Sequence, residues 1–387
     1  MCGIVGYIGT RPATDILMDG LRKLEYRGYD SAGLATVLEG ELHCLRAKGK
    51  LQNLQDKLDG EENPARLGIG HTRWATHGKP EEHNAHPHRD GTGRLAVVQN
   101  GIVENYRELR ETLKALGHEF TSDTDTEVVP HLIESHLSQL SPDDTQGRSL
   151  LLEATRRACQ QLHGAFALAI ISADYPDELV VVRQQAPLVI GFGQGEFFCA
   201  SDTPAIVPHT RAVLPMENGE LASLTPLGVE VYSFGGDRQR KHPITLNWNP
   251  IMVEKQGFKH FMLKEIYEQP GVVRTALETY IDNSWTASAV NTPLSPVNLG
   301  LPDALLDGLD HLQIVACGTS WHAALVGKYL IEDLANLPVL VQYASEFRYS
   351  PTPLIPNTLT IGVTQSGETA DTLAALEMEQ NRRAAHP

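Results

Sequence analysis

The sequence lacks several features that would assign it to a broad class of protein. Its 387 residues contain no apolar run near the ~18 residues that cross a membrane, and the N-terminus has neither the basic segment nor the apolar core of a secretory signal. Lysine and arginine number 32 against 48 acidic residues, and the formal net charge of -16 argues against nucleic acid or an anionic membrane as partner. These absences predict a cytoplasmic protein that binds neither.

Cysteine is scarce and scattered. Five cysteines without CxxC spacing predict neither a disulfide framework nor a zinc site. Four histidines gather in THGKPEEHNAHPH, but their spacings fit no standard zinc pattern and the stretch contains no cysteine, so we expect no metal there. We expect one or more of them to shape the loop by hydrogen bonding. These histidines are His77, His83, His86 and His88.

The N-terminal stretch MCGIVGYIG raises the first chemical question. When residue 2 is small, Met1 is commonly removed, which leaves an α-amine and a thiol on Cys2. These groups titrate near pH ~8 and ~8.5, so the amine can take the proton of the thiol close to neutrality. The alternative is a small core cysteine in front of a buried strand. Position alone leaves both interpretations open.

The hydrophobic pattern changes along the chain. Up to about residue 240, many short apolar strands with few helices predict antiparallel sheets layered with helices, an α+β architecture. The following stretch, with FKHFMLKEIYEQP as an expected helix, is typical of a linker. From about residue 311, apolar strands alternate with helical stretches that begin near Ser320, Ser345 and Thr369. This alternation predicts an α/β, doubly wound parallel sheet.

Two polar stretches of the first region suggest a catalytic site. HTRWATHG carries Arg73, whose planar fork suits a carboxylate, together with Thr76 and His77. Its alternative is a solvated polar loop. In VVQNGIVENY, the Asn100 side-chain amide and the Gly101 backbone N–H form a natural pair of oxyanion donors, and the alternative is a β-turn.

Two further stretches carry charge. In SDTDTE, Asp125 could receive a substrate ammonium group, or the segment could cap the helix that follows it. In LEYRGYDSAG, Arg27 lies in an expected tight turn that could shelter a nucleophile or serve surface packing.

In this order along the chain, CGIVGYIG, LEYRGYDSAG, HTRWATHG, NAHPH, QNGIVENY and SDTDTE resemble the glutaminase domain of N-terminal-nucleophile amidotransferases. The resemblance implies that Cys2 attacks the side-chain amide of glutamine, with its own α-amine as base. Asn100 and Gly101 would form the oxyanion hole. Arg73 would bind the carboxylate of glutamine and Asp125 its ammonium group. Thr76 and His77 would line the pocket. Trp74 would gate the passage of ammonia.

Two loops of the second region place glycine and hydroxyl residues between an expected strand and an expected helix. They are GTS, after the strand HLQIVAC, and QSGET, after the strand TLTIGVT. Backbone N–H groups and a helix dipole at such positions favour phosphate, although capping by Ser or Thr is the alternative for each loop alone. The second region has neither a Walker loop nor a GxGxxG motif. As a pair, with ASEFRY between them, the loops resemble a sugar isomerase (SIS) domain. Its sugar-phosphate residues would be Thr319, Ser320, Thr364, Gln365, Ser366 and Thr369, with Thr364 where the bacterial pattern has Ser.

Together with KEIYEQP, the two regions resemble the glutamine:fructose-6-phosphate aminotransferases (isomerizing), the glucosamine-6-phosphate synthases. The resemblance implies a glutaminase domain over 2–240, a linker over 241–290, and an incomplete first SIS domain over 291–387. We expect the second SIS domain, which carries the imine-forming lysine in this family, to be absent from this chain. The family makes glucosamine 6-phosphate and glutamate from fructose 6-phosphate and glutamine, without a cofactor, as a homodimer. We expect this chain to hydrolyse glutamine at most.

Other functions remain to be compared with this one. The SGGxDS loop of asparagine synthetase and the acidic phosphoribosyl-diphosphate loop of amidophosphoribosyltransferase are both missing from the sequence. A noncatalytic phosphosugar sensor is one alternative. A stand-alone glutaminase that supplies ammonia to a partner is the other. A Cys2→Ala variant separates sensor from enzyme, because only the enzyme would lose glutamate release.

Overall fold

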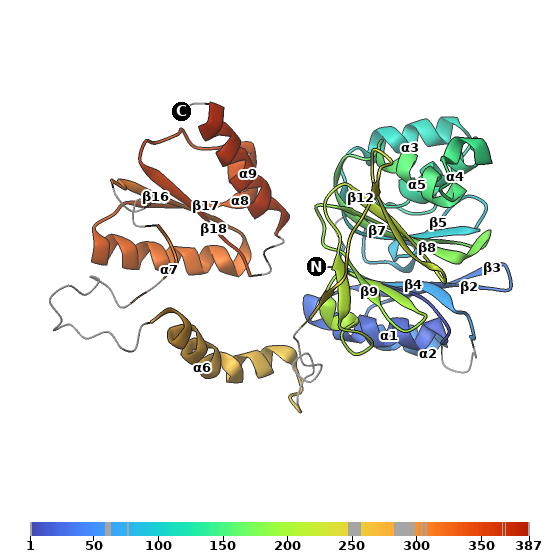
Figure 1. Cartoon of the computed structure of the whole chain (residues 1–387), viewed down its shortest axis with the longest axis horizontal. Helices are drawn as coiled ribbons and strands as arrows, with labels where there is room; N and C mark the ends of the chain where they lie inside the picture. Colours follow the sequence, from blue (N-terminus) through green and yellow to red (C-terminus); the bar gives the residue numbers. More distant parts are fainter. Residues whose placement is uncertain are drawn as a thin grey trace. The chain divides into compact units, whose positions relative to one another are not determined.

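The computed structural model describes residues 2–58, 63–75, 77–246, 257–281, 297, 299–302, 305, 308–365, 367 and 369–385 (Figure 1). The chain divides into two compact units, Met1–Gln256 and Gly257–Pro387. Within the described part of the chain, none of the helices has the length and apolar character needed to span a membrane.

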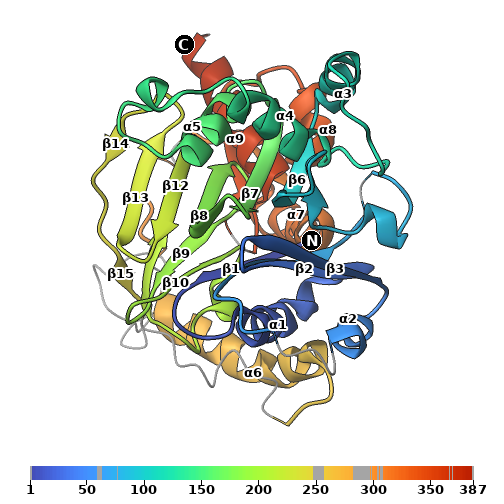
Figure 2. The same ribbon diagram turned by 90° about the vertical axis from the view of Figure 1, so that its right-hand side faces the viewer.

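Two antiparallel sheets form the centre of the first unit (Figure 2). The first has the order β15-β11-β9-β10-β1-β4-β2-β3, with bounds Ile244–Thr245, Ala212–Pro215, Val189–Phe192, Phe197–Ala200, Gly3–Ile8, Leu67–Arg73, Ser31–Leu38 and Glu41–Lys48. The second has the order β14-β13-β12-β8-β7-β6-β5, with bounds Arg238–Gln239, Gly228–Ser233, Glu220–Thr225, Tyr175–Gln184, Gly164–Ser172, Leu95–Val103 and His88–Arg89.

Helices cover the outer face of each sheet, so the unit has four layers. The helices are α1 (Ala13–Lys23), α2 (Leu51–Leu58), α3 (Tyr106–Ala115), α4 (Val128–Leu137) and α5 (Leu150–Cys159). The described residues of this unit also form four short 3-10 turns, η1 (Glu25–Arg27), η2 (Glu82–Asn84), η3 (Pro142–Thr145) and η4 (Thr203–Ala205). Figure 1 shows α1 and α2 on one side of the sheets and α3, α4 and α5 on the other.

Strand alternation explains why this unit has three separate cores. Neighbouring residues of one strand face opposite sides of its sheet. Ile4 therefore joins the core between the two sheets, whereas Val5 packs toward α1 and α2. In the other sheet Val98 faces inward and Val97 packs under α3, α4 and α5. The layered α+β fold expected from the sequence is confirmed.

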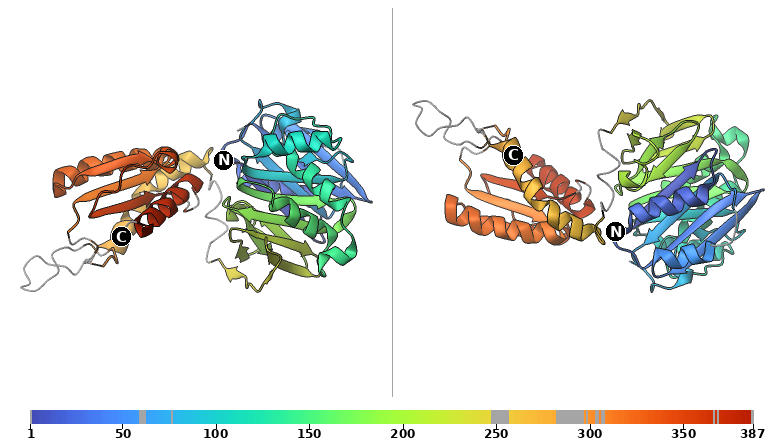
Figure 3. Two further views of the ribbon diagram at one scale, coloured as in Figure 1. Left: turned by 90° about the horizontal axis from the view of Figure 1, so that it is seen from above. Right: turned by 90° about the horizontal axis from the view of Figure 1, so that it is seen from below.

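The second unit holds a three-stranded parallel sheet in the order β17-β16-β18, with bounds Val339–Tyr343, His311–Ala316 and Thr358–Val363. Helix α7 (Gly318–Ala335) packs on one face. Helices α8 (Ala344–Tyr349) and α9 (Ala370–Ala385) pack on the other, as Figure 3 shows. Helices on both faces make the unit doubly wound, as expected from the alternating pattern.

Helix α6 (Phe261–Tyr280) belongs to the second unit and is mostly exposed. The sequence predicted a helix that ends near Pro270, but the structure continues it through this proline for another ten residues. A proline inside a helix removes one hydrogen bond without necessarily ending the helix. The expected linker over 241–290 lies only partly within the described residues.

Candidate active site

Cys2 immediately precedes β1, which pairs with β10 on one side and β4 on the other. Its Sγ accepts a hydrogen bond from the backbone N–H of Trp74 at 3.2 Å, just beyond the end of β4. Burial raises the pKa of the Cys2 thiol, while the Trp74 hydrogen bond and the charges of Arg73 and Arg27 act in the opposite direction. Cys2 is therefore a neutral thiol near pH 7, and nucleophilic attack by its sulfur requires a base.

Asn100 reaches Cys2 from β6 of the facing sheet. Its Nδ2 donates to the backbone carbonyl of Cys2 at 3.2 Å, and its Oδ1 lies 3.1 Å from Nε2 of His71. Because a backbone carbonyl can only accept, the amide nitrogen faces Cys2 and the amide oxygen faces His71. His71 consequently carries its proton on Nε2 and donates it to Asn100. This hydrogen bond keeps the N–H groups of Asn100 directed toward the nucleophile.

Gly101 follows Asn100 inside the same strand. Its φ of 99° lies in the region that favours glycine, and a Cβ there would come within 2.0 Å of the Ala165 carbonyl oxygen. Asn100 and Gly101 both lie within β6 (Leu95–Val103), so the β-turn alternative is wrong. Only a glycine lets β6 keep its close approach to β7 at this position.

Three buried histidines lie behind Asn100. His71 and His86 stack with ring centroids 4.2 Å apart, and His86 meets His88 edge to face at 4.8 Å. Burial lowers the pKa of all three rings, that of His71 to about 3, so each ring is neutral near pH 7. Nδ1 of His86 accepts the backbone N–H of Gln99 at 3.2 Å. The expectation that a histidine of this loop shapes it by hydrogen bonding is confirmed for His86.

The loop that carries His86 lies directly on β2 at Gly33. A Cβ at Gly33 would lie 2.2 Å from the carbonyl oxygen of His86 and 2.8 Å from that of Leu45. Both neighbours are backbone atoms that cannot move like the end of a flexible side chain. The absence of a side chain at Gly33 therefore allows the backbone of His86 to lie close to β2.

Arg73 ends β4 and is almost wholly buried, so the solvated-loop alternative is wrong for it. Its guanidinium donates to the backbone carbonyls of His77, Gly78 and Lys79, the last two at 3.4 Å. Burial lowers the pKa of Arg73, and the nearby carboxylates of Asp30 and Asp125 act against that decrease. A carboxylate ligand would offer this cation shorter, charge-assisted bonds than the two long carbonyl contacts.

Asp125 is buried beside the same loop. Its Oδ2 accepts the backbone N–H of Val103 at 2.8 Å and Nε2 of Gln99 at 3.1 Å. Its Oδ1 lies 3.6 Å from Nδ1 of His77. The N-terminal cap of α4 is Glu127 and makes no side-chain capping bond, so the helix-cap alternative does not account for Asp125. Protein donors hold one carboxylate oxygen and leave the other suited to a substrate ammonium group.

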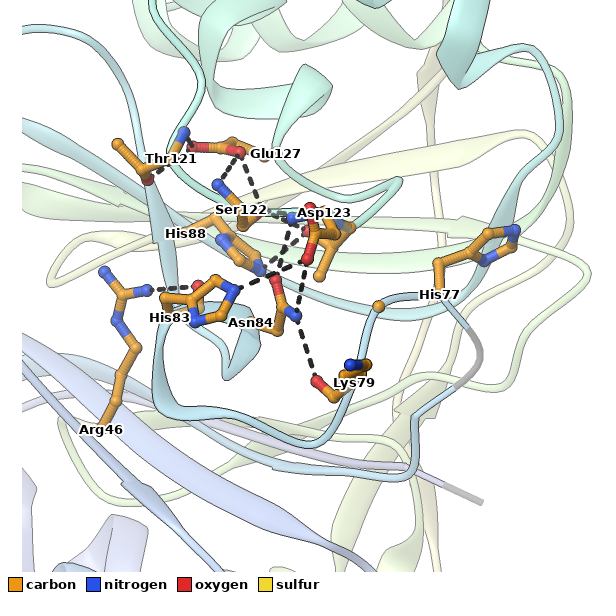
Figure 4. A network of polar contacts seen from close by, with 12 residues as sticks. Arg46, His77, Lys79, His83, Asn84, His88, Thr121, Ser122, Asp123 and Glu127 are labelled. Carbon is orange, nitrogen blue, oxygen red and sulfur yellow. Dashed lines mark hydrogen bonds and ion pairs between the residues drawn. The ribbon is translucent and has the colours of Figure 1, made fainter.

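A further network, which shares the carbonyl of Lys79 with Arg73, joins the loop after Arg73 to the segment that carries Asp125 (Figure 4). The Asn84 amide donates to the Asp123 carboxylate at 3.4 Å and accepts the Asp123 backbone N–H at 2.9 Å. The same amide nitrogen donates to the carbonyl of Lys79 at 3.1 Å. In Figure 4 the ring of His77 points away from this network. The network therefore fixes the loop on its far side and leaves His77 on the side of Asp125.

Arg27 and Trp74 border the site on another side. Arg27 donates to the carbonyl and hydroxyl oxygens of Ser201, both at 3.3 Å. Trp74 is 55% exposed, and its ring lies 3.3 Å from the place where a Cβ on Gly28 would be. Gly28 has a φ of 76°, so the expected turn is present next to Trp74. Arg27 thus packs against Ser201 and adds positive charge near the Cys2 thiol.

The hydroxyl residues of the second unit gather at one edge of its parallel sheet. Thr319 and Ser320 lie in the first turn of α7, directly after β16. Thr364 follows β18, and its Oγ1 lies 2.9 Å from Oγ1 of Thr369, which precedes α9. Gln365 is exposed beside them. Because Ala316 on β16 is in register with Val363 on β18, both loops leave the sheet at the same level.

Two predicted site residues, Thr76 and Ser366, lie outside the described residues. The structure brings Cys2, Asn100 and Arg73 together, and places Asp125 and His77 next to one another. Sequence reasoning gave no role to His71, Gln99 or Asp30. Only the alternation of β4, which turns a histidine inward two residues before Arg73, offered a signal for His71.

Models of two families match the chain. A glutamine amidotransferase domain matches residues 71–208 and a SIS domain matches residues 306–387. A glutamine–fructose-6-phosphate aminotransferase (isomerizing) from Thermosynechococcus vestitus (strain NIES-2133 / IAM M-273 / BP-1) is 72% identical over 383 residues, which is 99% of this chain and 60% of the relative. The chain is similar to this aminotransferase along almost the whole of its own length.

A second aminotransferase of the family, from Nostoc sp. (strain PCC 9229), is 67% identical over 99% of this chain and 60% of its own length. The chain thus spans about 60% of the length of the aminotransferases that it matches. A solved glutamine phosphoribosylpyrophosphate amidotransferase from B. subtilis superposes with a TM-score of 0.52 over 91% of this chain and 71% of that one. At 21% identity, this likeness supports the fold alone.

Proposed function

We propose that this chain carries the glutaminase half of a glutamine–fructose-6-phosphate aminotransferase, with Cys2 as the nucleophile. The contact that supports this most directly is the hydrogen bond from Asn100 to the carbonyl of Cys2, because it puts an oriented amide donor beside the sulfur. In the complete enzyme, ammonia from glutamine would convert fructose 6-phosphate to glucosamine 6-phosphate. This chain alone would release glutamate and ammonia.

Attack begins with a proton transfer from the neutral Cys2 thiol. Once Met1 is removed, the α-amine of Cys2 takes this proton, and the sulfur bonds to the side-chain carbonyl carbon of glutamine. The oxygen of the resulting tetrahedral adduct takes up the electron pair. Nδ2 of Asn100 and the backbone N–H of Gly101 would donate to this oxyanion.

Collapse of the adduct breaks the bond from carbon to nitrogen. The nitrogen receives the proton held by the α-amine and leaves as ammonia, and a γ-glutamyl thioester remains on Cys2. Water then attacks the thioester, with the α-amine again as base, and releases glutamate and the free thiol. Atoms and charges balance without a metal or a redox group.

Substrate binding would use the charges on either side of Cys2. Arg73 would exchange its long carbonyl contacts for the glutamine α-carboxylate, and Asp125 would receive the α-ammonium through the oxygen that faces His77. Thr76 and His77 would line the pocket, and Trp74 would gate the passage of ammonia.

The second unit would bind the sugar phosphate at the edge of its sheet. The backbone N–H groups at the start of α7 and the hydroxyl pair of Thr364 and Thr369 support this role, because both can donate to phosphate oxygens. Gln365, Ser366, Thr319 and Ser320 would complete the site. We propose domain limits of 2–240 and 291–387, a linker over 241–290, a cytoplasmic location, and a homodimer for the full-length enzyme.

Mass spectrometry tests the proposal on the purified chain with Met1 removed, supplied with glutamine and fructose 6-phosphate. We expect glutamate, and a loss on the order of 10⁴-fold or more in the Cys2→Ala variant. Cys44→Ala is the matched control, because Cys44 is also half-buried with a pKa raised by burial but does not lie at this site. Glutamate release that survives Cys2→Ala would refute the proposal. Sugar binding without any glutamate release would indicate a sensor instead.

A further inference from the structure

Three potential metal ligands of the first unit converge away from Cys2. His131 and Glu134 lie one turn apart on α4 (Val128–Leu137), and His118 lies on the segment between α3 and α4. The ligand atoms of the three side chains all lie within 4.8 Å of one another. We call this group the α4 cluster. It shares no residue with the histidines of the 77–88 loop.

Distances within the α4 cluster are wrong for hydrogen bonds and right for an ion. Nδ1 of His118 lies 3.5 Å from Oε2 of Glu134, and Nδ1 of His131 lies 3.7 Å from the same oxygen. Contacts this long are not hydrogen bonds. Two donors bound tetrahedrally to Zn²⁺ at about 2.05 Å lie about 3.3 Å apart. The two pairs that involve Glu134 exceed this spacing by a few tenths of an ångström, and the pair of histidine nitrogens, which lies within 4.8 Å, would have to close by up to about 1.5 Å.

Burial leaves His131 in need of a partner. Its side chain is 2% exposed, and within the described part of the chain neither of its ring nitrogens makes a hydrogen bond. A buried polar atom without a partner is costly.

Glu134 is already held in position for such a role. The backbone N–H of Gly91 donates to its Oε2 at 3.0 Å, from the loop between β5 and β6. The rings of His118 and Phe120 pack against His131 with centroids 5.1 Å and 4.6 Å away. A hydrogen-bonded ligand oxygen and packed ligand rings are the supports that metal sites commonly have around their ligands.

We propose that His118, His131 and Glu134 bind one divalent transition-metal ion, with Zn²⁺ as the occupant that two imidazoles and one carboxylate suit best. The fourth position would hold water. The ion would join the segment after α3 to helix α4, and residues 119–127, including Asp125, lie between its ligands. Its role would be to stabilise this segment, and the proposal does not depend on the glutaminase activity.

Zinc binding to the metal-free full chain tests this assignment. We expect one tightly held Zn²⁺ per chain by elemental analysis after dialysis. His118→Gln and Glu134→Gln should each weaken binding about 100-fold or more, at least as much as the loss of a supporting partner does. The amide oxygen that Glu134→Gln introduces can still accept the Gly91 N–H, so that variant should fold. Glu119→Gln and His43→Gln are exposed, matched controls that should bind as the parent does.

Cobalt distinguishes this site from the cysteines. Co²⁺ bound by two imidazoles and a carboxylate should show the absorption of a tetrahedral ion without a thiolate charge-transfer band, and Cys2→Ala should not change the spectrum. Zn²⁺ should raise the melting temperature of the parent and of both controls, but not of the two ligand variants. Equal zinc affinity in parent and ligand variants, or a thiolate band lost in Cys2→Ala, would overturn the proposal.

Discussion

The two units place their candidate sites in opposite physical settings. In the first unit, the side chains around Cys2 are buried between two sheets, and each is fixed by another side chain or by backbone. In the second unit, hydroxyl groups lie at the open edge of a three-stranded sheet. The unit also exposes large apolar side chains on α7, among them Tyr329, Leu330 and Leu334. Covalent chemistry needs preorganised groups, whereas phosphate can be bound by backbone N–H groups alone.

Replacing Asn100 by Ala should have the largest effect on this contrast. We expect the rate of glutamate release to fall about 10²- to 10³-fold, because one oxyanion donor is lost. Steady-state kinetics with glutamine measure the loss, which should appear in kcat more than in KM. Asn53→Ala, an exposed amide that bonds the carbonyl of Lys48, serves as the control.

His71→Phe separates positioning from direct contact. The phenyl ring can keep the stack on His86 but cannot donate to Asn100, so kcat should fall less than in Asn100→Ala. Added to Asn100→Ala, it should have almost no further effect, because His71 acts through Asn100. Additive losses in the double variant would show that His71 has a role of its own.

Gly101→Ala should be the most destabilising of these variants. A Cβ 2.0 Å from the Ala165 carbonyl, at a φ of 99°, should cost about 3 kcal/mol or more of the free energy of unfolding. Urea denaturation measures it. Gly117→Ala is the matched control, since Gly117 also has a positive φ but nothing within 4 Å of an added Cβ. Equal costs in both would show that strain, and not the clash, dominates.

Mild acid should destabilise the first unit. The pKa of His71 is about 3 in the fold against 6.5 for the free ring, and those of His86 and His88 are also lowered. Below pH ~6.5 the unfolded chain binds protons that the folded chain does not, so the free energy of unfolding decreases as the pH is lowered. Each histidine should remove about 1 kcal/mol between pH 6.5 and 5.5. Urea denaturation across this range should show a shallower slope in His71→Phe.

Thr364→Val should have the smallest effect, and it tests the candidate site of the second unit. Loss of the hydrogen bond to Thr369 should lower the free energy of fructose 6-phosphate binding by about 1 kcal/mol. Calorimetry with fructose 6-phosphate measures binding. Thr358→Val, at the opposite end of β18, is the control. We expect both variants to release glutamate as the parent does, and a fall in either would contradict this expectation.

Much of the fold followed from the sequence because hydrophobic alternation is strong here. The many short strands expected up to about residue 240 and the change from antiparallel to parallel sheets are confirmed. Helix α5 and strand β3 are among the elements that were not predicted, and in both charged residues interrupt the apolar positions.

The support of the candidate site was harder to predict. His71 meets Asn100 only because β4 and β6 face each other across two sheets. Asp125 meets Gln99 because the segment before α4 packs on β6. The α4 cluster shows the same limit. His118 lies in the segment before α4, whereas His131 lies within that helix, and no regular spacing links them.

Gly33 has a consequence for how this protein tolerates change. Its missing side chain lets the carbonyl of His86 lie on β2, and His86 in turn stacks on the ring that orients Asn100. A residue with no chemistry of its own, on a strand away from the nucleophile, is therefore joined to the reaction by three successive contacts. In a complete substitution scan for glutamate release, Gly33 should tolerate as few replacements as the residues that touch the substrate.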